Sequence, residues 1–357
     1  ATIRARKGMP MPDLPKADVP PPAPLDRRTL LRSGVGGGLV VLTGGGAWWL
    51  RGRRPAPLTR GTRPLMGTVA EVLIAHPGPE AGALVRAALE AIAGVERRMT
   101  RFNAVSEIGR VNAAPGRFHP VSPMTAHVVR TALETARDSD GRFDPGLGAL
   151  GRKWGIYGGG ESGPRFRVPT ARIEAPSPGY RGIQLSGDAD RFRLRVDDDA
   201  VQLDLGGIAK GYAVELAVDL LRERGVGRAL VNVGGDIHAL GTHPEGRPWQ
   251  VGVRHPRQPG RLLGVLKLQD CAVATSGDYE RYAIRGGQRI HHLLDPRSGG
   301  PAPFHQSVTV TAPGAMVADA LATAAFATPP TQARRLLRRL APGEWITVDG
   351  EGRIARG

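Results

Sequence analysis

A carboxylate and a hydroxyl interrupt an otherwise apolar segment of the sequence, Met316–Phe326 (MVADALATAAF). These two polar residues, Asp319 and Thr323, are four residues apart, a spacing that puts both side chains on one face of an α-helix. An ionised Asp on an apolar helix needs a cation or a hydrogen-bonding partner. Carboxylate and hydroxyl oxygens are hard ligands that suit Mg²⁺ or Ca²⁺. The residues alone leave a second interpretation open, in which Asp319 caps a neighbouring loop and Thr323 bonds to its own helix.

Two glycine-rich segments could present backbone N–H groups to a phosphate. The first, Asp204–Ala213 (DLGGIAKGYA), reads as a strand end, a glycine turn, Lys210 and a helix start, and helix N-termini attract phosphate. Its glycine-to-lysine spacing is too short for a Walker A loop, and no Ser or Thr follows the lysine. The second, Asn232–Gly241 (NVGGDIHALG), places Gly234 and Gly235 where a ligand could approach the backbone closely. By themselves both segments are equally compatible with ordinary tight turns.

A histidine beside a polar loop is the candidate general base. His292 lies in HHLLDPRSGGP (His291–Pro301), three residues before Asp295, and follows ATSGDYERY (Ala274–Tyr282) closely along the chain. An imidazole titrates near neutral pH and can accept a proton from a hydroxyl. The segment alone leaves a purely structural histidine as the alternative.

Short strands and amphipathic helices must position these groups. A Pro-Gly pair before Met316–Phe326 and a Pro-Pro pair after it predict a buried helix at that segment. KGYAVELAVDLLRERG predicts a helix closed by Gly225, and FRLRVDDDAVQLDL predicts a hairpin with an Asp-rich turn. Paired strands joined by short turns recur through the chain, which predicts an α+β fold of antiparallel sheets with helices packed on them.

The composition fits a globular protein and argues against several classes of function. The chain has 357 residues, of which 41% are hydrophobic and 23% charged, enough for one large or two ordinary domains. The net charge is +16, but the basic residues are scattered and only 5% of residues are aromatic, so nucleic acid is not an expected partner. The single cysteine, Cys271, allows no internal disulfide, multi-cysteine zinc site or iron–sulfur cluster.

The first 55 residues have the design of an export leader. Arg27-Arg28 precedes a mildly apolar, glycine-rich stretch, Ser33–Leu50, and a basic cluster begins at Arg51. This order resembles a twin-arginine export signal. A short membrane anchor or a disordered tail is the alternative interpretation. We therefore expect residues 1–55 to form the leader or anchor, residues 60–357 to form the catalytic domain, and the protein to reach the periplasm or the periplasmic face of the inner membrane.

Taken together, eight motifs of the chain resemble the ApbE family, the FAD:protein FMN transferases. In order they are PLMGT, MTRFNAVSEIGRVN, FDPGLGALGRKWG, DLGGIAKGYAVE, NVGGDI, ATSGDYERY, HHLLDPRSGGP and VADALATAAF. The resemblance runs from about Leu65 to Thr328, most of the chain outside the leader. It implies an α+β flavin transferase domain related to the T-fold, FAD as the substrate, and Mg²⁺ at the FAD pyrophosphate.

Matched motif by motif, the resemblance also implies roles for individual residues. The magnesium ligands would be Asp319, Thr323 and the backbone carbonyl of Ala209, and His292 would be the base that activates the acceptor hydroxyl. Flavin-pocket positions would be His292 together with Met66, Asp204, Lys210, Gly234, Gly235, Asp236, Ser276, Gly277 and Asp278.

The implied reaction transfers FMN from FAD to a Thr or Ser hydroxyl of an acceptor protein and releases AMP. Two alternatives use the same pocket: hydrolysis of FAD to FMN and AMP, and flavin binding without catalysis. A flavin reductase is disfavoured, because no G-x-G-x-x-G fingerprint follows a strand and opens a helix. The leader is similar to that of the NosX-like members of the family, which implies acceptors that are flavin-carrying membrane electron-transfer proteins.

Overall fold

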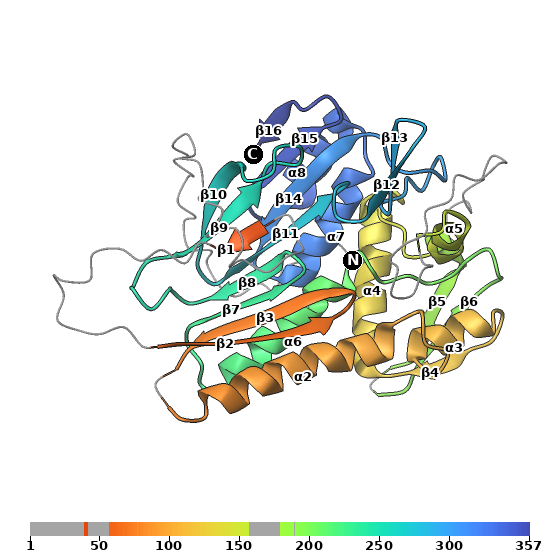
Figure 1. Cartoon of the computed structure of the whole chain (residues 1–357). Helices are drawn as coiled ribbons and strands as arrows, with labels where there is room; N and C mark the ends of the chain where they lie inside the picture. Colours follow the sequence, from red (N-terminus) through yellow and green to blue (C-terminus); the bar gives the residue numbers. More distant parts are fainter. Residues whose placement is uncertain (1–38, 42–56, 77, 157–178, 189) are drawn as a thin grey trace.

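An eight-stranded antiparallel sheet forms the centre of the molecule in a computed structural model, which describes residues 39–41, 57–76, 78–156, 179–188 and 190–357 (Figure 1). The strand order is β16-β15-β14-β11-β8-β7-β3-β2. The strands are β2 (Leu58–Leu65), β3 (Thr68–Ala75), β7 (Ala229–Val233), β8 (Asp236–Leu240), β11 (Cys271–Gly277), β14 (His305–Ala312), β15 (Trp345–Asp349) and β16 (Ile354–Arg356). Every residue of β14 is buried, as expected for a strand covered on both faces of the sheet.

Three helices cover one face of this sheet (Figure 1). They are α2 (Ala81–Met99) on β2 and β3, α6 (Ala209–Glu223) on β7 and β8, and α7 (Ala315–Phe326) on β11 and β14. A fourth helix, α8 (Pro330–Leu340), packs on α7. The bounds of α7 confirm the buried helix expected between the Pro-Gly and Pro-Pro pairs. Gly225, with a φ of 79°, follows the C-cap residue Arg224 of α6 and confirms that helix stop.

A three-stranded sheet covers the opposite face. It is formed by β1 (Leu39–Val41), β9 (Trp249–Arg254) and β10 (Leu262–Leu268), with β9 in the middle. Strand residues of the large sheet that point away from the helices, such as Leu73, Ile237 and Val273, form a second apolar core with it. Strand β1 belongs to the expected leader, whereas Arg27-Arg28 and most of that segment lie outside the described residues.

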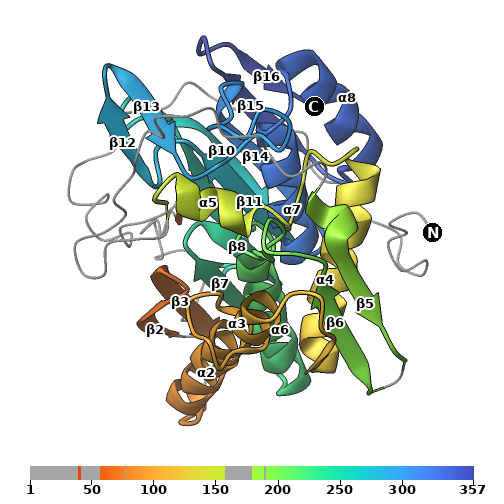
Figure 2. The same ribbon diagram turned by 90° about the vertical axis from the view of Figure 1, so that its right-hand side faces the viewer.

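A smaller unit flanks the helix layer (Figure 2). It contains α3 (Glu107–Ala113), β4 (His119–Val121), α4 (Pro123–Asp138), α5 (Gly148–Lys153), a 3₁₀ turn (Gly179–Gly182), β5 (Ile183–Ser186) and β6 (Phe192–Val196). The hairpin expected from FRLRVDDDAVQLDL is wrong, because β6 pairs with β4 on one side and β5 on the other. With both edges of β6 occupied, the chain after the Asp-rich turn leaves this sheet, and Gln202 bridges Leu147 instead.

The last element is a separate hairpin, β12 (Tyr282–Arg285) and β13 (Gln288–His291). Every pairing between named strands is antiparallel, and helices pack on the large sheet, so the α+β prediction is confirmed. In the described part of the chain, no helix combines the length and apolar character that a membrane crossing requires.

Candidate active site

A lysine and two buried carboxylates meet where α6, β8 and α7 converge. The Lys210 ammonium, in the first turn of α6, donates to Asp236 at the start of β8 and lies 3.4 Å from both carboxylate oxygens of Asp319 on α7. The backbone N–H of Gly211 donates to Oδ2 of Asp319 at 3.1 Å. The side chains of Asp236 and Asp319 are 2% and 3% exposed, so Lys210 is their main source of positive charge in the described structure.

The cluster carries one more carboxylate than ammonium, and its ionisation reflects this imbalance. Burial and the neighbouring Asp319 raise the pKa of Asp236 above its usual range. Burial works against the charge on Lys210, but Asp236 and Asp319 outweigh it and raise the pKa of this lysine. The lysine therefore stays an ammonium at neutral pH, and the site retains affinity for additional positive charge.

Thr323 lies one turn after Asp319 on the same helix face, so these two residues are brought together as the sequence predicts. Its hydroxyl oxygen is 3.2 Å from that of Ser276 on β11. The glycine loop before α6 packs directly against it, since a Cβ atom added at Gly207 would lie 3.0 Å from the Thr323 hydroxyl oxygen. The loop that leads to Ala209 is thus held beside both Asp319 and Thr323.

This set of groups fits a magnesium ion better than a transition metal. Its donors are a buried carboxylate, hydroxyls and loop backbone, all of them oxygens. No group of three or more His, Cys, Asp or Glu residues in the described part of the chain could hold a metal by itself. Mg²⁺ is commonly bound through one or two carboxylates together with substrate phosphates, so a sparse protein ligand set is compatible with it.

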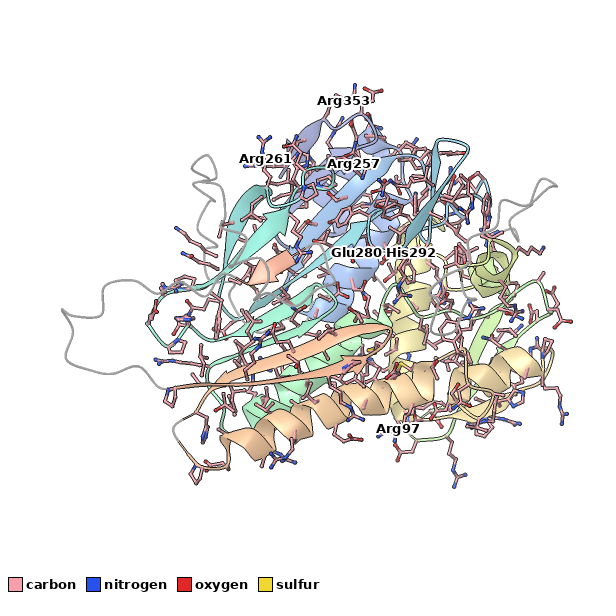
Figure 3. All side chains as sticks on the ribbon, viewed as in Figure 1. Arg97, Arg257, Arg261, Glu280, His292 and Arg353 are labelled. Carbon is pink, nitrogen blue, oxygen red and sulfur yellow. The ribbon has the colours of Figure 1, made fainter. Side chains whose placement is uncertain are left out.

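His292 follows strand β13 and is fixed as a neutral base. Its Nδ1 lies 3.3 Å from the backbone oxygen of Arg281, which also accepts the His292 backbone N–H at 3.2 Å. Because a carbonyl oxygen only accepts, this contact assigns the ring proton to Nδ1 and leaves the lone pair on Nε2. Burial, followed by the positive charge of Arg281, lowers the pKa of His292 to about 3. Figure 3 shows His292 below the β12–β13 hairpin, toward the middle of the molecule.

Arg281 also connects His292 to the turn between β2 and β3. Its Nη2 donates to the backbone oxygen of Gly67 at 2.9 Å. Met66 and Gly67 form this turn with φ values of 55° and 69°, and the Met66 N–H donates to Glu96 at 2.8 Å. Motif reasoning selected Met66 but missed Arg281 and Glu96. Arg281 stands inside the quoted ATSGDYERY motif, whereas Glu96 lies in an amphipathic helix that gives no sign of this contact.

The Gly234–Gly235 turn lies beside the Met66–Gly67 turn. Strands β3 and β7 pair side by side, and their hairpin turns are at the same end of the sheet. Gly234 and Gly235 have φ values of 63° and 99°, a region that other residues rarely adopt. A Cβ atom at Gly234 would lie 2.7 Å from the Thr68 side chain. These glycines are therefore required by the turn itself, and they bring backbone close to Asp236.

Comparison with known proteins then decides the family. The model of the ApbE family matches residues 66–346. The chain belongs to the ApbE family. It is 34% identical over 307 residues to a Rhodobacter capsulatus FAD:protein FMN transferase, covering 84% of this chain but 56% of the relative. It is 33% identical over 248 residues to a Klebsiella pneumoniae protein of the same name, covering 68% of this chain and 75% of the relative.

Solved ApbE structures share the fold. The ApbE protein of Thermotoga maritima superposes with a TM-score of 0.76 at 30% identity, covering 84% of this chain and 97% of that one. The apo form of the Pseudomonas stutzeri flavinyl transferase ApbE superposes with a TM-score of 0.70 at 30% identity, covering 85% and 95%. The described structure therefore shares the fold of both solved chains over nearly their whole length.

Two acidic residues that the ApbE motifs select are held by arginines. Asp204 accepts from Arg101 at 3.0 Å and from the Gly206 N–H at 2.8 Å, so it shapes the glycine loop before α6. Both carboxylate oxygens of Asp278 accept from Arg257, at 2.7 and 2.5 Å. None of the described hydrogen bonds and ion pairs joins Asp278 to the Lys210 cluster. The expected place of Asp204 and Asp278 in the flavin pocket stays a prediction, as does that of Gly277, which adjoins Asp278 at the end of β11.

Proposed function

We propose that this protein transfers the FMN part of FAD to a Thr or Ser hydroxyl of an acceptor protein, releases AMP, and uses Mg²⁺. The observation that carries this proposal is the juxtaposition of two features. The oxygen-rich cluster of Asp319 and Thr323 is suited to a cation-bound diphosphate. His292 is held through Arg281 at the Met66–Gly67 turn, which lies beside the Gly234–Gly235 turn that leads into Asp236. The relatives named FAD:protein FMN transferase support it.

In this reaction His292, Lys210 and the glycine turns would each have a separate role. The Nε2 lone pair of His292 accepts the proton of the acceptor hydroxyl as the hydroxyl oxygen attacks the phosphorus of the FMN half. A new oxygen–phosphorus bond forms, the bond between that phosphorus and the bridging oxygen breaks, and AMP leaves with the electron pair. Lys210 and the N-terminus of α6 supply positive charge to the diphosphate. The two glycine turns let the flavin approach the backbone.

Asp319, Thr323 and the Ala209 carbonyl would hold Mg²⁺. When bound, the ion would act as a Lewis acid that offsets negative charge on the diphosphate. The remaining contributions, which are positioning of the acceptor and acceptance of its proton, belong to the protein groups described above.

Mass spectrometry of an acceptor protein tests the activity. The purified protein is incubated with FAD and MgCl₂, with and without a flavin-carrying electron-transfer domain that contains surface Thr and Ser residues. We expect the acceptor to gain the mass of FMN, and FMN and AMP to accumulate slowly when the acceptor is omitted. Rapid release of free FMN that the acceptor does not suppress would instead support FAD hydrolysis, and FAD that survives unchanged would support a binding protein.

His292→Ala is the matching variant for the base. Loss of a general base slows a reaction by roughly 10²–10⁴-fold, so transfer should fall by that factor while FAD binding changes little. If the variant loses FAD affinity instead, His292 is a binding residue.

Export by a twin-arginine leader completes the proposal. It is supported by Arg27-Arg28, the mildly apolar stretch and the basic cluster that follows. Acceptors would then be membrane electron-transfer proteins at the periplasmic face. Replacing both arginines by Lys keeps the charge but removes the guanidinium groups, so the double variant should stay in the cytoplasm with its catalytic activity intact. Periplasmic recovery at the wild-type level would show that the leader is of another kind.

A further inference from the structure

Lys210 binds its two carboxylate partners unequally. Its ammonium makes a close ion pair with Asp236, and it lies at 3.4 Å from each oxygen of Asp319. Asp319 has a second support that does not involve the lysine, because the Gly211 N–H donates to its Oδ2 at 3.1 Å. The carboxylate of Asp319 is therefore held in place by the start of α6, and its contact with Lys210 is the weaker of the two ion pairs.

A divalent cation at Asp319 would encounter this ammonium directly. Two like charges within a few ångströms repel strongly where the surroundings are buried, and both carboxylate side chains are at least 97% buried. The lysine is the partner that can move, since its side chain is 26% exposed and a lysine side chain has four rotatable methylene groups. Asp236 can retain the ammonium while Asp319 releases it.

We propose that Lys210 is a built-in competitor of Mg²⁺ for the carboxylate of Asp319. Without the divalent ion the ammonium contacts both carboxylates. When the ion binds, the ammonium withdraws to Asp236 and faces the diphosphate of FAD. This inference rests on the proposed function, because it uses the magnesium site assigned there. It adds that Lys210 weakens metal binding in the absence of FAD, so that the dissociation constant of the ion depends on this lysine.

A titration with metal alone tests the competition. The probe is MnCl₂, which takes the same oxygen ligands as Mg²⁺, and the free ion is followed by its electron paramagnetic resonance signal with no FAD present. Removing one positive charge beside the ion in Lys210→Met should lower the dissociation constant by roughly tenfold to hundredfold. Lys267→Met on β10 is the matched control, because Lys267 is exposed and lies on the other sheet, and its dissociation constant should equal that of the wild type.

Two further variants keep the outcome interpretable. Lys210→Gln also removes the charge but retains a hydrogen-bond donor for Asp236, so it should bind Mn²⁺ more tightly than the wild type even if the Met variant unfolds. Circular dichroism verifies the fold of each variant. Asp319→Ala should abolish binding at this site. If Asp319→Ala abolishes binding but both Lys210 variants bind Mn²⁺ as the wild type does or more weakly, the competition is refuted and the magnesium site stands. If Asp319→Ala binds as the wild type does, the magnesium site itself is wrong.

Discussion

At the scale of single residues, the chemistry of the site depends on an acid that an apolar helix would not otherwise tolerate. Asp319 is 3% exposed, and its carboxylate is paired with Lys210 and accepts a hydrogen bond from the Gly211 N–H. Its removal leaves Lys210 and Asp236 as a balanced pair, so the fold should not depend on it. The helix itself does not require Asp319, since Ala has the higher helix propensity at such a position.

Asp319→Ala should abolish FMN transfer, by at least about 10²–10³-fold, because it removes the only charged metal ligand assigned to the site. Thr323→Val removes a neutral ligand of similar shape and should be milder. The two rates are compared at saturating FAD and MgCl₂, and thermal unfolding followed by circular dichroism serves as the control for folding. Transfer at the wild-type rate by the Asp319 variant would exclude this residue from the metal site.

At the scale of elements, the site depends on how closely the start of α6 approaches the start of α7. A Cβ atom at Gly211 would lie 2.2 Å from the backbone oxygen of Ala315 and 2.8 Å from the Cα of Met316. These are backbone atoms, so the contact cannot be relieved by a rotamer change. Only glycine at this position allows the Gly211 N–H to reach Asp319.

Gly211→Ala should therefore push α6 away from α7. Overpacking of this kind costs about 1–3 kcal/mol, which should appear as a lower free energy of unfolding in urea. Transfer should also slow, since the support of Asp319 is displaced. Gly82→Ala in the first turn of α2 is the matched control. The nearest atom to a Cβ added there is a nitrogen of the flexible Arg86 side chain, at 3.4 Å. Because Ala has a better helix propensity than Gly, the free energy of unfolding of this variant should be equal to that of the wild type or higher. An equal loss of unfolding free energy in Gly211→Ala and Gly82→Ala would contradict the packing argument.

At the scale of the whole molecule, buried neutral histidines should make the fold sensitive to acid. Burial is the first cause that lowers the pKa of His238, His291 and His305, each to about 4, and it also lowers that of His292. His238 on β8 is 4% exposed, and neither of its ring nitrogens has a hydrogen-bond partner in the described structure. An unfolded histidine has a pKa near 6.5, so between about pH 6.5 and 4 the unfolded state binds more protons than the folded state.

The free energy of unfolding should therefore fall as the pH is lowered through that window. His238 alone should account for about 3 kcal/mol of this decrease. His238→Leu removes this contribution, because Leu has a similar volume and does not titrate. Urea unfolding at pH 7 and pH 4.5 should show a smaller difference between the two pH values for the variant than for the wild type. A difference of the same size in both proteins would mean that His238 is not protonated on unfolding.

The sequence by itself determined the family and the fold class, and it predicted which residues carry the chemistry. The i, i+4 spacing of Asp319 and Thr323, the proline pairs around α7 and the order of eight motifs were sufficient to predict the helix, the α+β class and the family. These features are local, since helical periodicity, proline stops and motif spacing are written within short segments. The same local reasoning failed for FRLRVDDDAVQLDL, because the partners of β6 come from elsewhere in the chain.

Only the tertiary structure decided which charges meet. Lys210 and Asp319 are 109 residues apart, and Arg281 reaches Gly67 across 214 residues. The residue pattern of one segment cannot predict such a contact, because the contact depends on how the sheet order places α6, α7 and the two glycine turns. The sequence could therefore select Asp319 and His292 as candidates for the metal carboxylate and the base, whereas the contact of Lys210 with Asp319 and that of Arg281 with His292 follow from packing alone.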